Sequence, residues 1–445
     1  MTKKATFAVV SVVVSVACTF SLSALPAEQE LVTPQIVEDP EIKVLDTEGA
    51  GKLYQVGEHL VCVMEGTPRE MGFQHGRLLA KKIHHIAKEG YMARTLWQQG
   101  YTREYVTAQS DRMEKHFAPE HIEEMKGIVE GLHAAGIDDI TYEDIRLGVT
   151  SSELQHYGPD SPPACSNFAC WGKWTTGGRL LHGRNLDWNI KGGAQDDAAI
   201  LVRRPTGGTP FMIVGWAGSA GGVSGMNASG ITIGEMTSTS PDATFDGLPL
   251  HLVMRRVLEE ADNLQEAVDI VKEGPPTTGW NFVIGDAKIP DGRALEVDAK
   301  ACEVYAPMDP KENENTGHWA MEDAVRRTNH PVGEAQLMKL AKLYTQRIGM
   351  EINDLKIAIP LLKRENTWQR YDWMGRQIQA RPGGMDVKEA LQLLCNGPVR
   401  NDDTLHSWVF DPTNRVAYVA IAGNNPPVTA TSRAFTRIDL KKWFE

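Results

Sequence analysis

Residues 164–188 read ACSNFACWGKWTTGGRLLHGRNLDW. Runs of apolar and small residues flank a Gly-Gly pair, which predicts a strand, a tight turn and a returning strand. The two strands would lie side by side, so Arg184 and Asp187 would come close to Cys165. A neighbouring guanidinium stabilises a thiolate, and a carboxylate can orient an amine. The same residues also fit a packed cysteine beside an ordinary salt bridge, and the pattern alone leaves both interpretations open.

Upstream of this stretch, residues 61–164 have mainly helical patterns. One predicted helix carries five apolar residues on a single face: Ile122, Met125, Ile128, Val129 and Leu132. From Glu28 to about Asp46 the sequence is acidic, includes Pro34 and Pro40, and shows no apolar period. We therefore expect an extended linker followed by an entry strand over residues 28–60.

Downstream of Cys165, short β-type runs alternate with turns. Two amphipathic helices, at about 250–258 and 263–274, interrupt these runs. Hairpins combined with paired helices predict antiparallel sheets covered by helices, which is an α+β fold. The regular strand–helix–strand spacing of a parallel Rossmann sheet is missing.

The N-terminal segment has the pattern of a signal peptide over residues 1–27. Lys3 and Lys4 precede an uncharged stretch rich in Val and Ala, which ends in small residues. Ser and Thr residues within the stretch favour cleavage, so we expect an exported protein, periplasmic or secreted. Membrane anchoring through an uncleaved leader remains the alternative.

The charge balance bears on the possible partners of the chain, and the cysteine count bears on whether it has a free thiol. The chain has 46 Lys and Arg against 58 Asp and Glu, a formal net charge of −12, and no basic cluster. This balance repels phosphate backbones, so nucleic acid is excluded as a partner. Five cysteines remain beyond the leader, an odd number that leaves at least one thiol unpaired within the chain. They are Cys62, Cys165, Cys170, Cys302 and Cys395.

Five motif blocks together resemble a known family. Residues 183–188 (GRNLDW) fit the G-R-N-x-D-W string that follows the nucleophile in cysteine N-terminal-nucleophile hydrolases. The other blocks occur in the family's order, at residues 65–76, 215–231, 281–286 and 366–371. The set resembles the type that includes acyl-coenzyme A:6-aminopenicillanic acid acyltransferase, the peptidase C45 family. It is similar, more distantly, to the choloylglycine hydrolases.

The resemblance implies a fold and a maturation step. The expected fold is a four-layer αββα sandwich. The Cys165 thiol would attack the carbonyl of Ala164 and cut the chain. A helical α-chain ending at Ala164 and a β-chain over residues 165–445 would result. The freed α-amine of Cys165 would then serve as the general base for its own thiol.

The resemblance also implies roles for other residues. Arg184 and Asp187 match positions that hold the nucleophile and its amine. Asn281 would donate an N–H to the oxyanion of the tetrahedral intermediate, and Arg370 would support the site electrostatically. The implied activity is the cleavage or transfer of an acyl group from a small-molecule amide or thioester, through an acyl-Cys165 intermediate. No metal and no organic cofactor is expected.

Two departures from the choloylglycine pattern favour the acyltransferase-like branch. Met236 and Thr237 stand where choloylglycine hydrolases place an Asn at the end of the glycine-rich hairpin. More than a hundred residues also precede Cys165, whereas choloylglycine hydrolases begin almost at their nucleophile.

Alternatives from other classes remain open. One is a phospholipase-B-like esterase that uses the same cysteine on lipid esters. Another is a non-catalytic exported binding protein that retains the fold. A papain-like enzyme would pair Cys165 with His330 or His406, although the sequence around Cys165 lacks the papain signature. Ser166 is a further candidate nucleophile, but it has no amine of its own.

Overall fold

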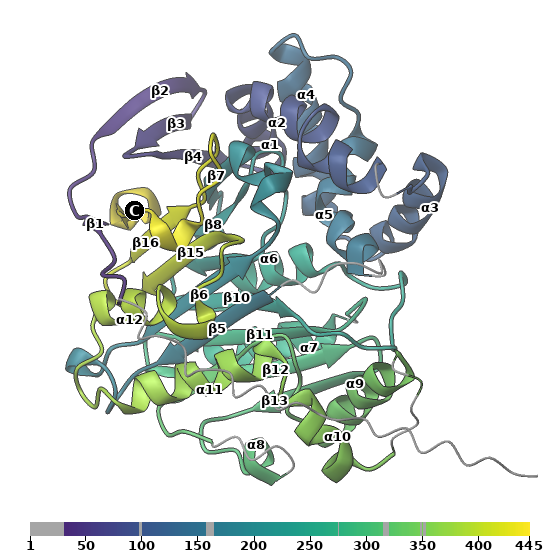
Figure 1. The fold of residues 1–445 in the computed structure, drawn as a ribbon. Helices are drawn as coiled ribbons and strands as arrows, with labels where there is room; N and C mark the ends of the chain where they lie inside the picture. Colours follow the sequence, from purple (N-terminus) through teal and green to yellow (C-terminus); the bar gives the residue numbers. More distant parts are fainter. Residues whose placement is uncertain are drawn as a thin grey trace, which may run out of the picture. The chain divides into compact units, whose positions relative to one another are not determined.

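Two β-sheets lie at the centre of the fold, with helices on the outer face of each (Figure 1). The structure is a computed structural model that describes residues 31–445 except 98–99, 157–163, 275, 315–319, 348 and 350–352. The expected signal peptide, residues 1–27, lies outside the described residues. Val32–Glu445 forms one compact unit.

The first sheet has seven strands and contains the segment around Cys165. All its neighbouring strands are antiparallel except the β1–β17 pair. In spatial order the strands are β1 (Ile36–Val37), β17 (Phe435–Asp439), β16 (Val416–Ile421), β15 (Thr404–Asp411), β6 (Leu181–Asp187), β5 (Ala164–Cys170) and β14 (Ala324–Arg327).

The second sheet has ten strands, and all its neighbours are antiparallel except the β4–β7 pair. In spatial order they are β13 (Ala301–Tyr305), β12 (Asp291–Asp298), β11 (Trp280–Asp286), β10 (Ile231–Thr237), β9 (Ser224–Asn227), β8 (Phe211–Trp216), β7 (Ala198–Pro205), β4 (His59–Gly66), β3 (Gly51–Val56) and β2 (Ile42–Glu48).

Three apolar cores define the four layers. Between the sheets, Val202 and Met212 of one sheet pack in one cluster with Trp408 and Val419 of the other. A second core joins the seven-stranded sheet to α11 (Asn366–Gln379) and α12 (Val387–Leu394). The largest core joins the ten-stranded sheet to the helices on its other side. The expected α+β fold with αββα layers is therefore confirmed.

Helices before Cys165 form one group in the sequence, and the later helices are distributed through the rest. The first group is α1 (Pro68–Leu78), α2 (Ala80–Lys88), α3 (Arg103–Glu114), α4 (Pro119–Ala134) and α5 (Tyr142–His156). The others are α6 (Leu250–Glu260), α7 (Leu264–Glu273), α8 (Lys311–Glu314), α9 (Glu334–Arg347), α10 (Leu355–Leu362) and α13 (Lys441–Phe444), besides α11 and α12. Among the described residues, none of the helices combines the length and apolar character needed to cross a bilayer.

The pair of α1 and α4 is unusually close because glycines face each other across it. A Cβ on Gly72 or Gly76 would lie only 2.0 Å from the carbonyl oxygen of Glu124 or Ile128. Gly131 of α4 makes the reciprocal contact, 2.1 Å from the Phe73 carbonyl. Any larger residue would push the helices apart, so the glycines fix where α4 lies.

The stretch expected as a linker contains strands instead. β1 and β2 both lie within it, and β2 pairs with β3 along its length. Nearly every residue of β2 is exposed. The strand therefore has no buried face, and its sequence lacks the alternation of apolar and polar residues by which strands are predicted. Through β4, whose Val61 pairs with Ile200 of β7, the chain before Cys165 extends the ten-stranded sheet. The boundary between an α-chain and a β-chain remains a prediction.

Candidate active site

Cys165 lies at the start of β5, next to β6 of the same hairpin. The register pairs Ala164 with Asp187, Cys165 with Leu186, and Asn167 with Arg184. Side chains alternate between the faces of a strand, so Cys165, Asn167 and Arg184 share one face. The hairpin expected around the Gly-Gly pair is therefore present, and it brings Arg184 and Asp187 to Cys165.

The thiol of Cys165 is in contact with the Arg184 guanidinium. Arg184 Nη2 lies 3.8 Å from Cys165 Sγ. The same guanidinium donates to Glu235 Oε1 at 2.6 Å, to the Glu235 carbonyl at 2.8 Å and to Ser224 Oγ at 2.7 Å. Burial raises the pKa of the Cys165 thiol to about 12, and the Arg184 charge opposes that rise. The thiol is therefore neutral at physiological pH, and its nucleophilic attack requires a base.

The backbone of Cys165 is held by two polar side chains from other elements. Its N–H donates to Asn329 Oδ1 at 2.6 Å. Arg370 of α11 donates to the Cys165 carbonyl, to Ser166 Oγ at 3.0 Å and to Asn329 Oδ1 at 2.9 Å. Asn329 in turn donates to the Thr237 carbonyl at 2.9 Å. The nitrogen that cleavage would turn into an amine thus faces a fixed amide oxygen.

Asp187 lies opposite Ala164, beside the bond expected to be cut. Its carboxylate accepts hydrogen bonds from Thr404 Oγ1 at 2.7 Å and Asn401 Nδ2 at 3.4 Å. Burial raises its pKa to about 7, against the opposing charges of Arg370 and Arg184. A carboxyl group with this pKa can both accept and release a proton at neutral pH.

The side-chain amide of Asn281, on β11, contacts the backbone around Asn329. Its Nδ2 donates to the carbonyl oxygens of Thr328 and His330, both at 2.9 Å. These contacts use both amide hydrogens, so they do not support the expected oxyanion role. Asn281 instead holds the backbone on either side of Asn329.

Part of the chain that includes Arg184 matches a known protein family. Residues 174–339 match the model of the acyl-coenzyme A:6-aminopenicillanic acid acyl-transferase family. The match confirms the resemblance drawn from the motifs. It includes Arg184, Asp187 and Asn281, begins after Cys165, and ends before Arg370. It supports an enzyme of the N-terminal-nucleophile acyltransferase or amidohydrolase type.

Three relatives match over longer stretches. An uncharacterized protein of Archaeoglobus fulgidus is 26% identical over 90% of this chain and 66% of its own length. Protein dcd1A of Dictyostelium discoideum is 22% identical over 88% of each chain. Protein dcd1B of the same organism is 24% identical over 58% of this chain and 55% of its own length. The chain thus spans less than two thirds of the archaeal protein and of dcd1B.

Two solved structures are similar to part of this chain. An N-acylethanolamine-hydrolyzing acid amidase ortholog of Caenorhabditis elegans is 18% identical, with a TM-score of 0.40 over 56% of this chain and 93% of that chain. Penicillin V acylase of Agrobacterium tumefaciens is 15% identical, with a TM-score of 0.36 over 62% of this chain and 92% of that chain.

Three residues around the thiol were not singled out from the sequence. Glu235 is the one charged residue of β10, and this isolated charge was an available signal. Asn329 is a loop position distant in sequence from Cys165, and nothing in its local sequence marks it. Ser224 lies within the motif block at residues 215–231, but that block did not predict a contact with Arg184. Burial raises the pKa of Glu235, and its Oε2 has no hydrogen-bond partner among the described residues.

The alternative nucleophile and bases occupy other environments. His330 stacks on Trp368 with ring centroids 3.9 Å apart, and its Nδ1 lies 2.9 Å from Thr367 Oγ1. His406 stacks on Trp216, and burial lowers its pKa to about 3. Ser166 Oγ accepts its hydrogen bond from Arg370. The contacts therefore favour the Cys165–Arg184 arrangement over a papain-like pair.

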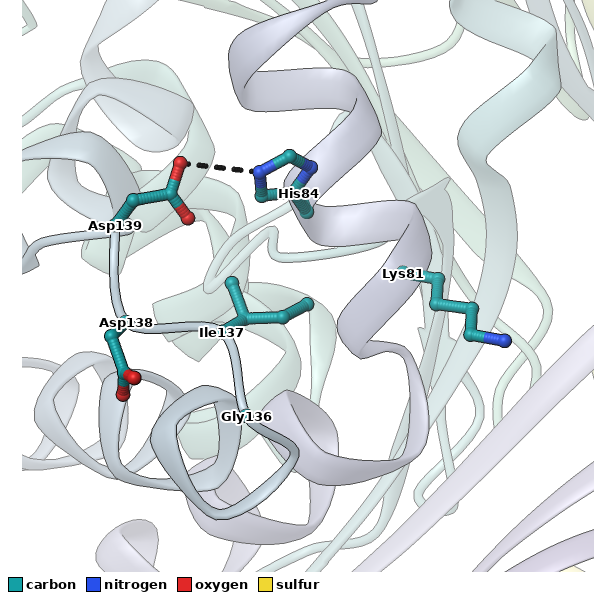
Figure 2. A pocket seen from close by; sticks show the side chains of 6 residues that line it. All are labelled: Lys81, His84, Gly136, Ile137, Asp138 and Asp139. Carbon is teal, nitrogen blue, oxygen red and sulfur yellow. Dashed lines mark hydrogen bonds and ion pairs between the residues drawn. The ribbon is translucent and has the colours of Figure 1, made fainter.

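Potential metal ligands, the other cysteines and a surface hollow are the remaining features relevant to function. Within the described part of the chain, no group of three or more His, Cys, Asp or Glu side chains is arranged to hold a metal ion. The five described cysteines are free thiols, and all except Cys302 are buried. An open hollow of about 380 Å³ lies beside α2. Figure 2 shows His84 of α2 directed towards Asp139, 3.2 Å away, at its edge.

Proposed function

We propose that the chain is a self-processing N-terminal-cysteine amidohydrolase or acyltransferase. The observation that carries the proposal is the surroundings of Cys165, whose Sγ contacts Arg184 while its N–H donates to Asn329. Cys165 thus places its thiol beside the Arg184 guanidinium, and its backbone nitrogen, which cleavage would turn into an amine, beside the Asn329 amide oxygen. An ordinary packed cysteine requires neither contact.

Self-cleavage begins with attack of Cys165 Sγ on the carbonyl carbon of Ala164. A C–S bond forms and the peptide C–N bond breaks, so the Ala164 acyl group moves to sulfur. The thiol proton ends on the nitrogen that becomes the α-amine, and we assign Asp187 as its relay because its pKa is near 7. Water then hydrolyses the thioester, which releases the Ala164 carboxylate and restores the thiol.

Turnover repeats this chemistry on a small-molecule substrate. The α-amine of Cys165 accepts the thiol proton while sulfur attacks the substrate carbonyl, and the proton passes to the leaving amine or thiol. The acyl-Cys165 thioester then transfers its acyl group to water or to an acceptor amine. Splitting the reaction into two transfers lowers each barrier. The alternative lipid-ester substrate uses the same two steps, so a comparison of ester and amide release separates the two activities.

Replacement of Cys165 tests the proposal. We expect wild-type protein to yield two chains, the second starting at Cys165, and Cys165→Ala to remain one chain without activity. Cys165→Ser keeps a weaker nucleophile, so it should cut more slowly. Intact mass and N-terminal sequencing measure each outcome. Cleavage at this bond in Cys165→Ala would contradict the mechanism.

The same sequencing tests the proposed export. The first residue of the α-chain, in protein isolated from an expressing cell, identifies whether and where a leader is removed. An α-chain that still starts at Met1 would favour the anchor alternative over a cleaved signal peptide.

A further inference from the structure

A cluster of buried charges joins the chain before Cys165 to the chain after it. Glu124 of α4 accepts from Arg203 Nε of β7 at 2.9 Å and from Arg255 Nη2 of α6 at 2.6 Å. All three side chains are almost completely buried, at 1% exposed or less. Glu259 of α6, 2.7 Å from Arg255, balances the second positive charge. Buried ions at this depth persist only when they are paired.

Each of the two arginines also donates to one backbone segment, residues 217–223 between β8 and β9, which we call the 217–223 loop. Arg203 Nη2 donates to the Ser219 carbonyl at 2.8 Å, and Arg255 Nη1 donates to the Ala220 carbonyl at 2.5 Å. The loop's path is therefore set by two cations whose shared counter-ion, Glu124, lies in α4.

His75 of α1 holds the same loop from its first glycine. Its Nε2 accepts the Gly218 N–H at 2.9 Å. The imidazole must be neutral to accept, and burial together with the Arg203 charge lowers its pKa to about 3. The glycine contacts between α1 and α4 fix His75 and Glu124 relative to each other. The motif block at residues 65–76 therefore supplies both the glycines that pack against α4 and the histidine that holds the loop.

The 217–223 loop leads directly to the Cys165 site. Ser224 follows the loop as the first residue of β9, and its Oγ accepts from Arg184 Nη1 at 2.7 Å. Arg184 Nη2 contacts the thiol. Each step from Glu124 to Cys165 is a hydrogen bond or a short piece of backbone between buried groups.

We propose that Glu124 and His75 are positioning residues for Cys165: they fix the 217–223 loop, and through Ser224 and Arg184 they set the reactivity of the thiol. The inference rests on the proposed function, because it assigns a use to the Cys165 nucleophile. It also means that the α-chain contributes to the site after cleavage. Residues before Ala164 would be part of the enzyme rather than only a leader to be removed.

The test is the pH dependence of the self-cleavage rate in purified precursor. Glu124→Gln keeps the shape of the side chain but removes the negative charge and one of the two acceptor oxygens that the arginines share, so the 217–223 loop and Arg184 should be held less firmly. We expect a self-cleavage rate at least about tenfold lower. We also expect the midpoint of its pH profile to shift to higher pH, because the Arg184 charge stabilises the Cys165 thiolate less. Asp144→Asn is the matched control: it removes a paired carboxylate from α5 that bonds to Lys88 and Arg103, and it should leave the midpoint unchanged.

A double-mutant cycle separates positioning from loss of stability. The double variant Glu124→Gln/Ser224→Ala should cleave itself no more slowly than the slower of the two single variants. Both substitutions interrupt the same series of contacts between Glu124 and Arg184. If Glu124→Gln fails to fold, His75→Leu, which removes only the acceptor of Gly218, provides the same measurement. The inference is overturned if the two substitutions slow self-cleavage additively, or if a folded variant keeps the wild-type pH midpoint. Either result leaves the proposed function intact. A wild-type precursor that never cuts overturns the proposed function, and the inference with it.

Discussion

At the scale of single residues, Arg184 connects the thiol to a carboxylate and a hydroxyl. Its guanidinium holds Glu235 through two separate contacts while one N–H reaches Sγ. A lysine keeps the charge but cannot reproduce this fork of donors. We therefore predict that Arg184→Lys folds and cuts itself roughly tenfold to a hundredfold more slowly. Time courses on denaturing gels measure the rate, and a wild-type rate would refute the positioning role of the guanidinium.

Asp187 gives a prediction for stability against pH. Its pKa is raised from 3.8 to about 7 in the folded chain, so between these values the unfolded state is ionised while the folded state retains its proton. Folded protein then binds more protons, and stability falls as pH rises through this window, by up to roughly 4 kcal/mol. In a Cys165→Ala background, Asp187→Asn should lose less stability between pH 4 and pH 7. Urea unfolding at several pH values measures the difference, and parallel curves would contradict the raised pKa.

The residues nearest in sequence to Cys165 could be predicted, and the distant ones could not. Arg184 and Asp187 follow from a hairpin whose register is fixed by a short turn. Arg370 was recognised only through the family resemblance, and the structure does bring it to Cys165. Glu235 and Asn329 come to Arg184 and to the Cys165 backbone through packing between segments far apart in sequence, and this proximity is encoded by no local pattern.

At the scale of elements, β11 supports the Asn329 loop through Asn281. Removal of its amide would delete the hydrogen bonds to the buried Thr328 and His330 carbonyls. We predict that Asn281→Ala destabilises the protein by about 1–3 kcal/mol and slows self-cleavage together with the loss of stability. Urea unfolding and the cleavage rate measure both effects. An oxyanion role instead predicts a rate loss of roughly 10²–10³ with unchanged stability.

Elements with one buried face were more predictable than exposed ones. The amphipathic helices α6 and α7 lie within one or two residues of their expected positions because each must bury an apolar stripe. β2 escaped detection because its side chains are exposed and only its backbone is paired. The αββα arrangement itself came from the resemblance, since hairpin patterns alone leave the stacking of sheets undefined.

At the scale of the whole molecule, the segments before and after Cys165 share both sheets. β2, β3 and β4 extend the ten-stranded sheet beyond β7, and β1 pairs with β17 in the other sheet. We therefore predict that the α-chain stays bound after cleavage. Size-exclusion chromatography under native conditions should give one peak that contains both chains. Separate elution of the α-chain without denaturant would contradict this shared architecture.

The parallel pairing of β4 with β7 has a consequence for how the molecule recovers from damage. Before cleavage, the two strands find each other as parts of one polymer, at an effective concentration that dilution does not change. After cleavage the same pairing becomes an encounter between two molecules, so recovery of unfolded mature enzyme slows as it is diluted. Under the proposed mechanism, the protein would therefore be assembled once as a single chain, and a later loss of structure in the cleaved form would be hard to reverse.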